Sequence, residues 1–309
     1  MMDSILLIPS PGGLAAGLEP LKARMRVAGS VEDALPHAAE VRALIALPHS
    51  MTRELVQVMP KLEWIQTLSA GVDPLLPLGI PERVRISNAA GLHAPQMSEL
   101  VFFQLLTMLR DTRAIFARQA AHQWKVEPQR LLWGKKLLIT GVGQIAVALA
   151  KRAQAFDMEV TGVSGGRTKA EGFDRIRPTS ELHAALAEAD FVVVLTPYTP
   201  ATHEMFDEAA FAAMRPHVLF INVGRGKVVK QADLLAALVE GRIAGAALDV
   251  FETEPLPADS PVWDAPNMLV TPHIGGFSDS FVRQVTPFLL QNFANWDAGR
   301  PLLNEVRLS

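Results

Sequence analysis

The strongest constraint on the fold is a regular alternation of short apolar runs with longer amphipathic stretches along the 309-residue chain. Short apolar runs are typical of buried strands, and the stretches between them have the length and spacing of helices. This alternation is typical of α/β proteins with parallel sheets, because each return to a parallel strand needs a crossover that is usually helical. The sequence therefore predicts an α/β fold.

The predicted strands form two sets, separated by a long apolar segment, Ser98–Trp124, which is predicted to be one helix or a helix pair with Ser98 as its N-cap. The first set consists of Ile5–Pro9, Val41–Leu47, Leu62–Leu68 and Val84–Ser87. The second set consists of Lys136–Thr140, Glu159–Val163, Phe191–Leu195, Val218–Asn222, Gly245–Val250 and Asn267–Thr271. Helices are predicted between and after these strands at Gln144–Phe156, Asp207–Met214, Gln231–Glu240 and Asp279–Ala298. Six strands with crossovers are the inventory of a doubly wound dinucleotide-binding (Rossmann) sheet.

The length of the chain favours two domains, because 309 residues are many for one hydrophobic core. The first four strands and the last helix do not belong to the six-strand set. We therefore predict a Rossmann domain, residues 96–277, inserted into a smaller α/β domain made of residues 1–95 and 278–309. A ligand site is expected in the cleft between the two domains.

Composition excludes several classes of function. A net charge of −3 argues against a general binder of nucleic acid or membrane surfaces, since such proteins carry a basic excess. The absence of cysteine removes disulfides, thiolate metal sites and cysteine nucleophiles, and no metal site is predicted. The N-terminal segment lacks a basic region before its apolar run, and no apolar run has the length of a membrane helix. We expect a cytoplasmic protein.

A glycine-rich loop follows the first strand of the second set. In "GVGQIA", Gly141 permits a tight turn, Gly143 lets a pyrophosphate approach backbone N–H groups, and Ala146 allows close packing of helix and strand. Gln144 and Ile145 open the helix and belong to the predicted cofactor site. The motif alone is a weak signal, but the strand before it, the helix after it and the next strand at the right distance favour a dinucleotide site over a plain turn.

The end of the second strand of this set bears on the choice of cofactor. NAD-specific sites place Asp or Glu here to bind the ribose hydroxyls, and such a carboxylate would repel the 2′-phosphate of NADP. This chain has Ser164, followed by Arg167 and Lys169. A small hydroxyl with nearby cations suits a 2′-phosphate, so NADP(H) is favoured over NAD(H). The alternatives are NAD(H) and a solvated loop with incidental basic residues.

Charged residues follow three further strands of the second set. Arg225 lies in a glycine-flanked loop, Asp249 and Glu254 come at and after the next strand, and His273 follows the last one. The carboxyl ends of parallel strands are where open α/β sheets bind ligands. An arginine could bind a 2-oxo acid and polarise its carbonyl, a histidine could protonate the developing alkoxide, and a glutamate could keep the imidazole protonated. Taken singly, each residue could instead be a turn or surface residue.

Several motifs occur in one order along essentially the whole chain: "LSAGVD", "NAAGLHAPQMSEL", "GKKLLITGVGQIA", "LTPYTPAT", "INVGRGKVV", "GRIAGAALDVFETEP" and "NMLVTPHIGG". Together they resemble the D-isomer-specific 2-hydroxyacid dehydrogenase family, which includes glyoxylate/hydroxypyruvate reductases and phosphoglycerate dehydrogenases. The resemblance implies a flavodoxin-like substrate domain built from both termini, a Rossmann domain, and a homodimer formed through the latter. The loop after Val163 is more similar to the NADP-preferring reductases of the family than to its NAD-type members.

The resemblance also implies roles for individual residues. Arg225, Glu254 and His273 match the catalytic trio. The backbone N–H groups of Ala70 and Gly71 match those that hold the substrate carboxylate, so that Ala70, Gly71 and Arg225 form the predicted substrate site. Asp249 matches the residue that binds the nicotinamide carboxamide, Thr196 and Pro197 match the segment beside the adenine ribose, and Val223 is assigned to the same cofactor site.

The sequence departs from the family pattern in a few places. Ala146 replaces the commoner third glycine, and Met97-Ser98 replaces the more usual Val-Ala before Glu99, near the expected nicotinamide. Asp157 stands where many members have glycine, and a left-handed backbone there would cost an aspartate little.

The function predicted from these residues is reduction of a small 2-oxo acid, such as glyoxylate or hydroxypyruvate, to the D-2-hydroxy acid by hydride transfer from NAD(P)H. Two alternatives stay open. One is another enzyme of the same family, such as a phosphoglycerate dehydrogenase-like protein, and the other is a non-catalytic, nucleotide-sensing protein similar to the corepressors of this fold.

Overall fold

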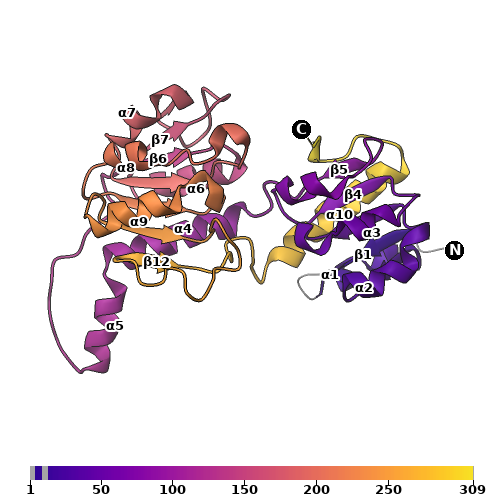
Figure 1. Ribbon diagram of the computed structural model, residues 1–309, viewed down its shortest axis with the longest axis horizontal. Coiled ribbons are helices and arrows are strands. Elements are labelled where there is room, and N and C mark those ends of the chain that lie inside the picture. Colours follow the sequence, from indigo (N-terminus) through magenta and orange to yellow (C-terminus); the bar gives the residue numbers. More distant parts are fainter. Residues whose placement is uncertain (1–3, 9–12, 309) are drawn as a thin grey trace. The chain divides into compact units, whose positions relative to one another are not determined.

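The computed structural model describes residues 4–8 and 13–308, and it divides into two compact units (Figure 1). One unit runs to His93 and resumes at Phe277, and the other is Ala94–Gly276. The chain thus passes between the units at 93/94 and 276/277, where the sequence led us to expect 95/96 and 277/278. Each unit has its own sheet and its own core.

The unit Ala94–Gly276 is built on a seven-stranded sheet in which every pairing is parallel. Its strands are β6 (Lys136–Thr140), β7 (Glu159–Val163), β8 (Arg175–Arg177), β9 (Phe191–Val194), β10 (Leu219–Asn222), β11 (Gly245–Leu248) and β12 (Met268–Val270). They lie in the order β12-β11-β10-β9-β6-β7-β8. Counted across the sheet from β8, the first six strands are β8, β7, β6, β9, β10 and β11. If β6 is numbered 1, this is the doubly wound order 3-2-1-4-5-6, and β12 adds a seventh strand. The predicted Rossmann fold is confirmed.

Helices cover both faces of this sheet. The helices of this unit are α4 (Ala94–Leu109), α5 (Thr112–Ala120), α6 (Gln144–Gln154), α7 (Leu182–Leu186), α8 (Glu208–Ala212) and α9 (Gln231–Val239), of which all but α5 pack on the sheet, with 3₁₀ turns η5 (Thr179–Glu181), η6 (Pro200–Thr202) and η7 (Gly226–Val228). Leu137 and Ile139 pack with α4 and α6, whereas Leu138 between them packs with α7, α8 and α9. Alternate side chains of one strand thus enter two separate apolar layers, as expected of a sheet buried on both faces.

The other unit has a six-stranded sheet in the order β13-β5-β4-β3-β1-β2. All its pairs are parallel except β13-β5, which is antiparallel. Its strands are β1 (Ile5–Leu7), β2 (Met25–Val27), β3 (Ala43–Ala46), β4 (Trp64–Thr67), β5 (Arg85–Ser87) and β13 (Glu305–Val306). Its helices are α1 (Leu14–Gly17), α2 (Val31–Ala34), α3 (Arg53–Gln57) and α10 (Phe281–Asp297), with turns η1 (Glu19–Arg24), η2 (Leu35–Glu40), η3 (Pro48–Ser50) and η4 (Asp73–Leu78). The order 2-1-3-4-5 of the first five strands is the flavodoxin-like order.

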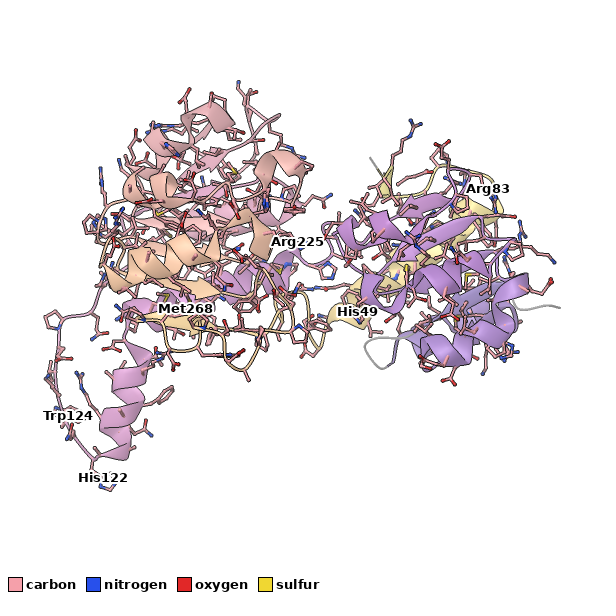
Figure 2. The ribbon with its side chains drawn as sticks, viewed as in Figure 1. His49, Arg83, His122, Trp124, Arg225 and Met268 are labelled. Atoms are coloured by element: carbon pink, nitrogen blue, oxygen red, sulfur yellow. The ribbon has the colours of Figure 1, made fainter. Side chains whose placement is uncertain are left out.

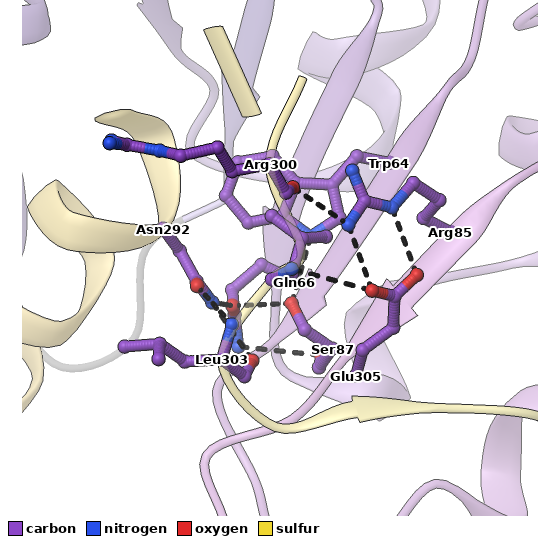
Figure 3. A network of polar contacts seen from close by, with 9 residues as sticks. Trp64, Gln66, Arg85, Ser87, Asn292, Arg300, Leu303 and Glu305 are labelled. Atoms are coloured by element: carbon purple, nitrogen blue, oxygen red, sulfur yellow. Dashed lines mark hydrogen bonds and ion pairs between the residues drawn. The ribbon is translucent and has the colours of Figure 1, made fainter. Parts of the chain in front are cut away.

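A buried polar network joins α10 and the segment after it to β4 and β5 (Figure 3). The Asn292 side chain of α10 donates to Gln66 Oε1 at 3.0 Å and exchanges two hydrogen bonds with the backbone of Leu303. Gln66 Oε1 also accepts from Ser87 Oγ at 2.7 Å, which in turn accepts from Trp64 Nε1. The network therefore attaches the C-terminal segment to β4 and β5.

The prediction of one helix or a helix pair over Ser98–Trp124 is confirmed as a pair, but the start of the first helix and the Ser98 N-cap are wrong. The helix begins at Ala94, with Pro95 in its first turn, where a proline loses no helical hydrogen bond. Ser98 is therefore inside the helix, and its hydroxyl donates to the carbonyl of Ala94 at 2.6 Å. The segment is a helix pair, because Asp111 takes a left-handed backbone (φ 44°) and caps α5 through Ala114 N–H. No residue of α5 is buried, and α5 extends away from the sheet of its own unit (Figure 1).

Three short strands were not predicted: β2, β8 and β13. Each has only two or three residues, and each is the edge strand of its sheet or an addition to one edge. Of the predicted first strand, Pro9 lies outside the described residues. Asp157, at the position where many members of the family have glycine, has a left-handed backbone (φ 55°). Within the described residues no helix is both long enough and apolar enough to cross a membrane.

Candidate active site

The register of the seven-stranded sheet brings the ends of five strands into one row. Thr140 and Asn222 both lie level with Val194, and Leu248 lies level with both Asn222 and Val270. The loops that leave this row carry the glycine motif, Thr196, Arg225, Asp249, Glu254 and His273. Parallel pairing therefore gathers segments that are far apart in the sequence at one edge of one sheet.

The glycine loop has the backbone that its sequence requires. Gly141 has φ 86°, and a Cβ at this position would lie 2.6 Å from Thr196 N. Gly143 precedes the first turn of the eleven-residue helix α6, and a Cβ there would meet nothing within 4 Å. Thr196 Oγ1 donates to Thr140 Oγ1 at 3.0 Å, which fixes the loop after β9 beside the glycine loop. The bare backbone and the helix N-terminus suit the pyrophosphate of a dinucleotide.

The other predicted cofactor residues near this loop differ in accessibility. Gln144 and Pro197 are exposed, Ile145 is half-buried, and Thr196 is buried. The side chain of Val223 packs in the apolar layer beneath α4 and α6, so only its backbone faces the loops. These positions fit a dinucleotide, and their contacts with a cofactor stay predictions.

The loop after β7 presents two exposed cations. Ser164 Oγ accepts from the backbone N–H groups of Gly166 (3.3 Å) and Arg167 (3.0 Å), which shapes a tight turn. Across residues 4–8 and 13–308, the Arg167 and Lys169 side chains have no hydrogen bond or ion pair. Arg177 on the adjacent edge strand is instead paired with Glu188 at 2.7 Å. Two cations are therefore available to an anion at this turn.

The Arg225 loop is fixed by Asn222 and by close packing. Asn222 Nδ2 donates to Arg225 O at 3.0 Å, and Asn222 Oδ1 accepts from Gly224 N–H at 3.1 Å. A Cβ on Gly226 would collide with the backbone of Phe251 and Glu252. Arg225 itself is half-buried, and one guanidinium nitrogen donates to Gly224 O at 2.8 Å.

His273 and Glu254 form a short hydrogen-bonded pair, with 2.6 Å between His273 Nδ1 and Glu254 Oε2. The hydrogen bond to Glu254 raises the pKa of His273, although burial opposes that rise. Burial acts to raise the pKa of Glu254, but the hydrogen bonds from His273 and from Phe251 N–H outweigh it and the pKa is lowered. The positive charge of Arg225 acts on both groups, lowering both pKa values. The predicted trio thus converges in one unit, and the pair favours an imidazolium beside a carboxylate.

Asp249 holds the loop that carries His273. It is 1% exposed, and its two carboxylate oxygens accept from Thr271 Oγ1 (2.6 Å), Ile274 N (3.0 Å) and Gly275 N (2.9 Å). Burial raises the pKa of Asp249 against these hydrogen bonds. The loop needs such support because His273 has a left-handed backbone, φ 52°, which is costly for a residue other than glycine. The predicted contact of Asp249 with a nicotinamide stays a prediction.

Three supporting residues were missed at the sequence level: Asn222, Thr271 and Gln104. Gln104 lies in α4, is fully buried, and donates to Thr271 Oγ1 at 3.2 Å. Its own Oε1 accepts no hydrogen bond from any described residue. The sequence did contain an indication of these residues, because each is a polar residue in or beside an apolar run. A polar side chain buried in such a run needs a hydrogen-bond partner.

The predicted carboxylate loop, Ala70 and Gly71, belongs to the other unit and follows β4. Both residues are half-buried, and their backbone N–H groups donate to no other described residue. Elsewhere in the described part of the chain, no group of three or more His, Asp or Glu side chains could hold a metal ion.

Comparison with known proteins decides the family. A family model described as "D-isomer specific 2-hydroxyacid dehydrogenase, NAD binding domain" matches residues 102–275. The chain belongs to this family. Glyoxylate/hydroxypyruvate reductase B of Citrobacter koseri is 34% identical over 254 residues, covering 80% of this chain and 78% of that protein. The family assignment based on the sequence motifs is confirmed.

Solved structures of the 2-hydroxyacid dehydrogenase family agree in fold over nearly the whole chain. A family protein from Aeromonas salmonicida has a TM-score of 0.91 and 34% identity, covering 99% of both chains. The NADPH-dependent glyoxylate/hydroxypyruvate reductase of Sinorhizobium meliloti, solved with NADP and sulfate, has a TM-score of 0.86 and 30% identity, covering 98% of this chain and 97% of that one.

Proposed function

We propose that this 2-hydroxyacid dehydrogenase reduces a small 2-oxo acid of the glyoxylate or hydroxypyruvate kind to the D-2-hydroxy acid. The observation that carries the proposal is the 2.6 Å pair of His273 and Glu254, in loops that leave the same sheet edge as the glycine loop. A protonated imidazole next to a carbonyl oxygen is the group needed to neutralise the alkoxide that forms during reduction.

Each member of the trio has a task. Arg225 binds the substrate and stabilises negative charge on the keto oxygen as the carbonyl becomes an alkoxide. His273 gives that oxygen its proton, and Glu254 keeps the imidazole protonated and oriented. The backbone N–H groups of Ala70 and Gly71 hold the substrate carboxylate. NAD(P)H, when bound, supplies the hydride that the keto carbon receives.

We propose NADP(H) as the preferred cofactor. Ser164 leaves the end of β7 without a carboxylate, and Arg167 and Lys169 have no partner in the described structure. A 2′-phosphate would give both cations a charge-assisted partner. The Sinorhizobium meliloti relative is described as NADPH-dependent, and the corresponding protein of Xanthobacter autotrophicus, 28% identical, was solved with NADPH. NAD(H) is the alternative.

The test of this function is an initial-rate survey of 2-oxo acids with NADPH and with NADH, on the wild type and on His273→Ala. We expect the wild type to reduce glyoxylate or hydroxypyruvate, and His273→Ala to lose about 100-fold or more in turnover. The variant should bind NADPH as the wild type does, which fluorescence titration measures. Retained turnover in His273→Ala would exclude His273 as the acid. A wild type that binds NADPH but reduces no 2-oxo acid would favour the nucleotide-sensing alternative, and activity confined to phosphorylated substrates would favour the phosphoglycerate-type one.

We also propose a cytoplasmic homodimer. Apolar side chains are exposed on α5 and the segment after it, among them Phe116 (64%), Trp124 (95%) and Val126 (84%); Trp124 is labelled in Figure 2. An exposed apolar surface of this kind is typical of a protein interface. Light scattering on the protein as it elutes from a size-exclusion column should give twice the mass of one chain. A monomer at micromolar concentration would contradict the dimer.

A further inference from the structure

In the loop Ser69–Val72 every carbonyl group accepts a hydrogen bond, whereas three consecutive N–H groups donate to none of the residues that the structure describes. The carbonyl oxygens of Ser69, Ala70, Gly71 and Val72 accept hydrogen bonds from Ala89 N, Asn88 Nδ2, Ser69 Oγ and Leu75 N, at 2.7–2.9 Å. The N–H groups of Ala70, Gly71 and Val72 have no acceptor within the described residues. Such one-sidedness is unusual, because most backbone N–H groups of a folded chain are paired with protein or with water.

Two side chains set the direction of the central peptides. Asn88 Nδ2 donates to Ala70 O at 2.9 Å, and Ser69 Oγ donates to Gly71 O at 2.7 Å. In a trans peptide the C=O and N–H groups point in opposite directions. Fixing the Ala70 and Gly71 carbonyls therefore also fixes the N–H groups of Gly71 and Val72, which point away from Asn88 and from the Ser69 hydroxyl.

Both side chains are themselves held in place. Asn88 is 7% exposed, and its Oδ1 accepts from Ala90 N–H at 3.0 Å, so its NH₂ group is the one that faces Ala70. Ser69 Oγ lies 3.1 Å from Thr67 Oγ1, and Thr67 Oγ1 accepts from Ser69 N–H at 3.2 Å. These two hydrogen bonds, from Asn88 to Ala70 O and from Ser69 Oγ to Gly71 O, are needed because Gly71 has no Cβ and a peptide next to glycine can rotate at low steric cost.

We infer that Ser69 and Asn88 are positioning residues for the substrate carboxylate, and that Val72 N–H is a third donor beside those of Ala70 and Gly71. The inference rests on the proposed function, since it assumes that this loop binds a carboxylate. Without the hydrogen bonds from Ser69 Oγ and Asn88 Nδ2, the peptides can rotate and present a carbonyl oxygen to the substrate carboxylate. The attraction between N–H and carboxylate is then replaced by a repulsion between two oxygens. Ser69 and Asn88 therefore favour anionic over neutral substrates without touching them.

The experiment compares a 2-oxo acid with its neutral 2-oxo amide, using the full-length protein and NADPH. For Ser69→Ala we expect kcat/KM for the acid to fall about ten-fold, the value of one charge-assisted hydrogen bond, through a higher KM. The kcat/KM for the amide and the KM for NADPH should stay within two-fold of the wild type. Ser69→Thr keeps the hydroxyl and should restore the preference for the acid.

A second pair of variants separates positioning from general stability. Asn88→Ala should lose the preference for the acid as Ser69→Ala does. Asn304→Gly is its control: Asn304 donates to the carbonyls of Asn88 and Ala90 but not to the Ser69–Val72 loop, and glycine accepts its left-handed backbone (φ 51°). It should lower the unfolding temperature and leave the preference unchanged. Equal losses for acid and amide, or an unchanged acid kcat/KM in Ser69→Ala, would overturn the inference while leaving the proposed function intact. A wild type that reduces no 2-oxo acid would instead overturn the proposed function.

Discussion

His273 Nδ1 lies 2.6 Å from Glu254 Oε2, so that an imidazole and a carboxylate nineteen residues apart share one short hydrogen bond. The two residues come from the loops that follow β11 and β12, which are adjacent parallel strands. The side chains are 50% and 35% exposed, so the pair is accessible to a substrate and is still close enough to perturb both groups. Its consequence is electrostatic: the pKa of His273 is raised, mainly by the hydrogen bond to Glu254.

The first prediction concerns Glu254→Gln and the pH dependence of reduction. In the proposed mechanism reduction needs the protonated imidazole, so we expect activity below the pKa of His273 and its loss as the pH rises through that pKa. Removing the carboxylate removes the cause that raises this pKa, and the alkaline limb of kcat should move to lower pH. Near pH 8 we expect turnover to fall about ten-fold or more, with a smaller loss at pH 6. A pH–rate profile measures this, and an alkaline limb that stays in place would show that His273 does not titrate in the reaction.

That Arg225, Glu254 and His273 converge was predictable from their positions after successive strands along the sequence. Arg225, Glu254 and His273 each follow an apolar run, and the carboxyl ends of parallel strands meet at one edge of a sheet. The positive φ of His273 and the Asp249 contacts that support it were not predictable, because they depend on how one loop folds. The apolar run around Gln104 indicated a buried polar side chain, but its partner could not be predicted, because Thr271 is 167 residues away in the sequence.

The second prediction concerns Arg167→Ala and the choice of cofactor. If the Arg167 guanidinium pairs with a 2′-phosphate, kcat/KM for NADPH should fall about ten-fold, while that for NADH, which lacks the phosphate, should not change. Arg175→Ala is a matched control, because Arg175 is a nearby basic residue that is already paired with Glu159 at 2.9 Å. Initial rates with both cofactors decide the matter. Parallel losses for NADPH and NADH, or a wild type that prefers NADH, would contradict our interpretation of this loop.

The third prediction concerns Thr271→Val, which keeps the shape of the side chain and removes its hydroxyl. Asp249 loses its 2.6 Å donor, and the Gln104 amide loses its acceptor, both at buried positions. We expect a loss of about 1–3 kcal/mol in the free energy of unfolding. The pKa of Asp249, already raised by burial, should rise further, because a hydrogen bond that lowers it is gone.

The Thr271→Val variant should therefore differ from the wild type on the acid side of the pH–rate profile. The ionised Asp249 accepts the three hydrogen bonds that hold the His273 loop more strongly than a neutral carboxyl would, so activity should be lost as the pH falls through its raised pKa. That acid limb should lie at higher pH in Thr271→Val than in the wild type, and Thr271→Ser, which keeps the hydroxyl, should resemble the wild type. An unchanged acid limb would mean that Asp249 does not control the loop.

The elements of the fold were predictable to different degrees. Central strands such as β6 and β9 stand out because both faces are buried and each contains a run of at least three apolar residues. The edge strand β8 reads Arg-Ile-Arg and is largely accessible, so its sequence carries no such signal. The start of α4 was misplaced because Ser98 looked like an N-cap, whereas Pro95 in the first turn was the better marker.

The last prediction compares a buried and an exposed part of one polar network. Asn292 is fully buried, and Asn292→Leu would leave both the N–H and the C=O of Leu303 without their side-chain partner. The variant also removes a donor to the buried Gln66 Oε1, and polar groups left without a partner are costly, so we expect a loss of about 3 kcal/mol and a fall of several degrees in the unfolding temperature of this unit. Glu305→Gln is the comparison, since the Arg85–Glu305 ion pair is about one-third exposed on both sides. That change should cost less than about 1 kcal/mol, because water replaces most of what an exposed ion pair contributes. Thermal unfolding followed by circular dichroism measures both variants, and similar losses for the two would show that the stability of the network does not come from its buried members.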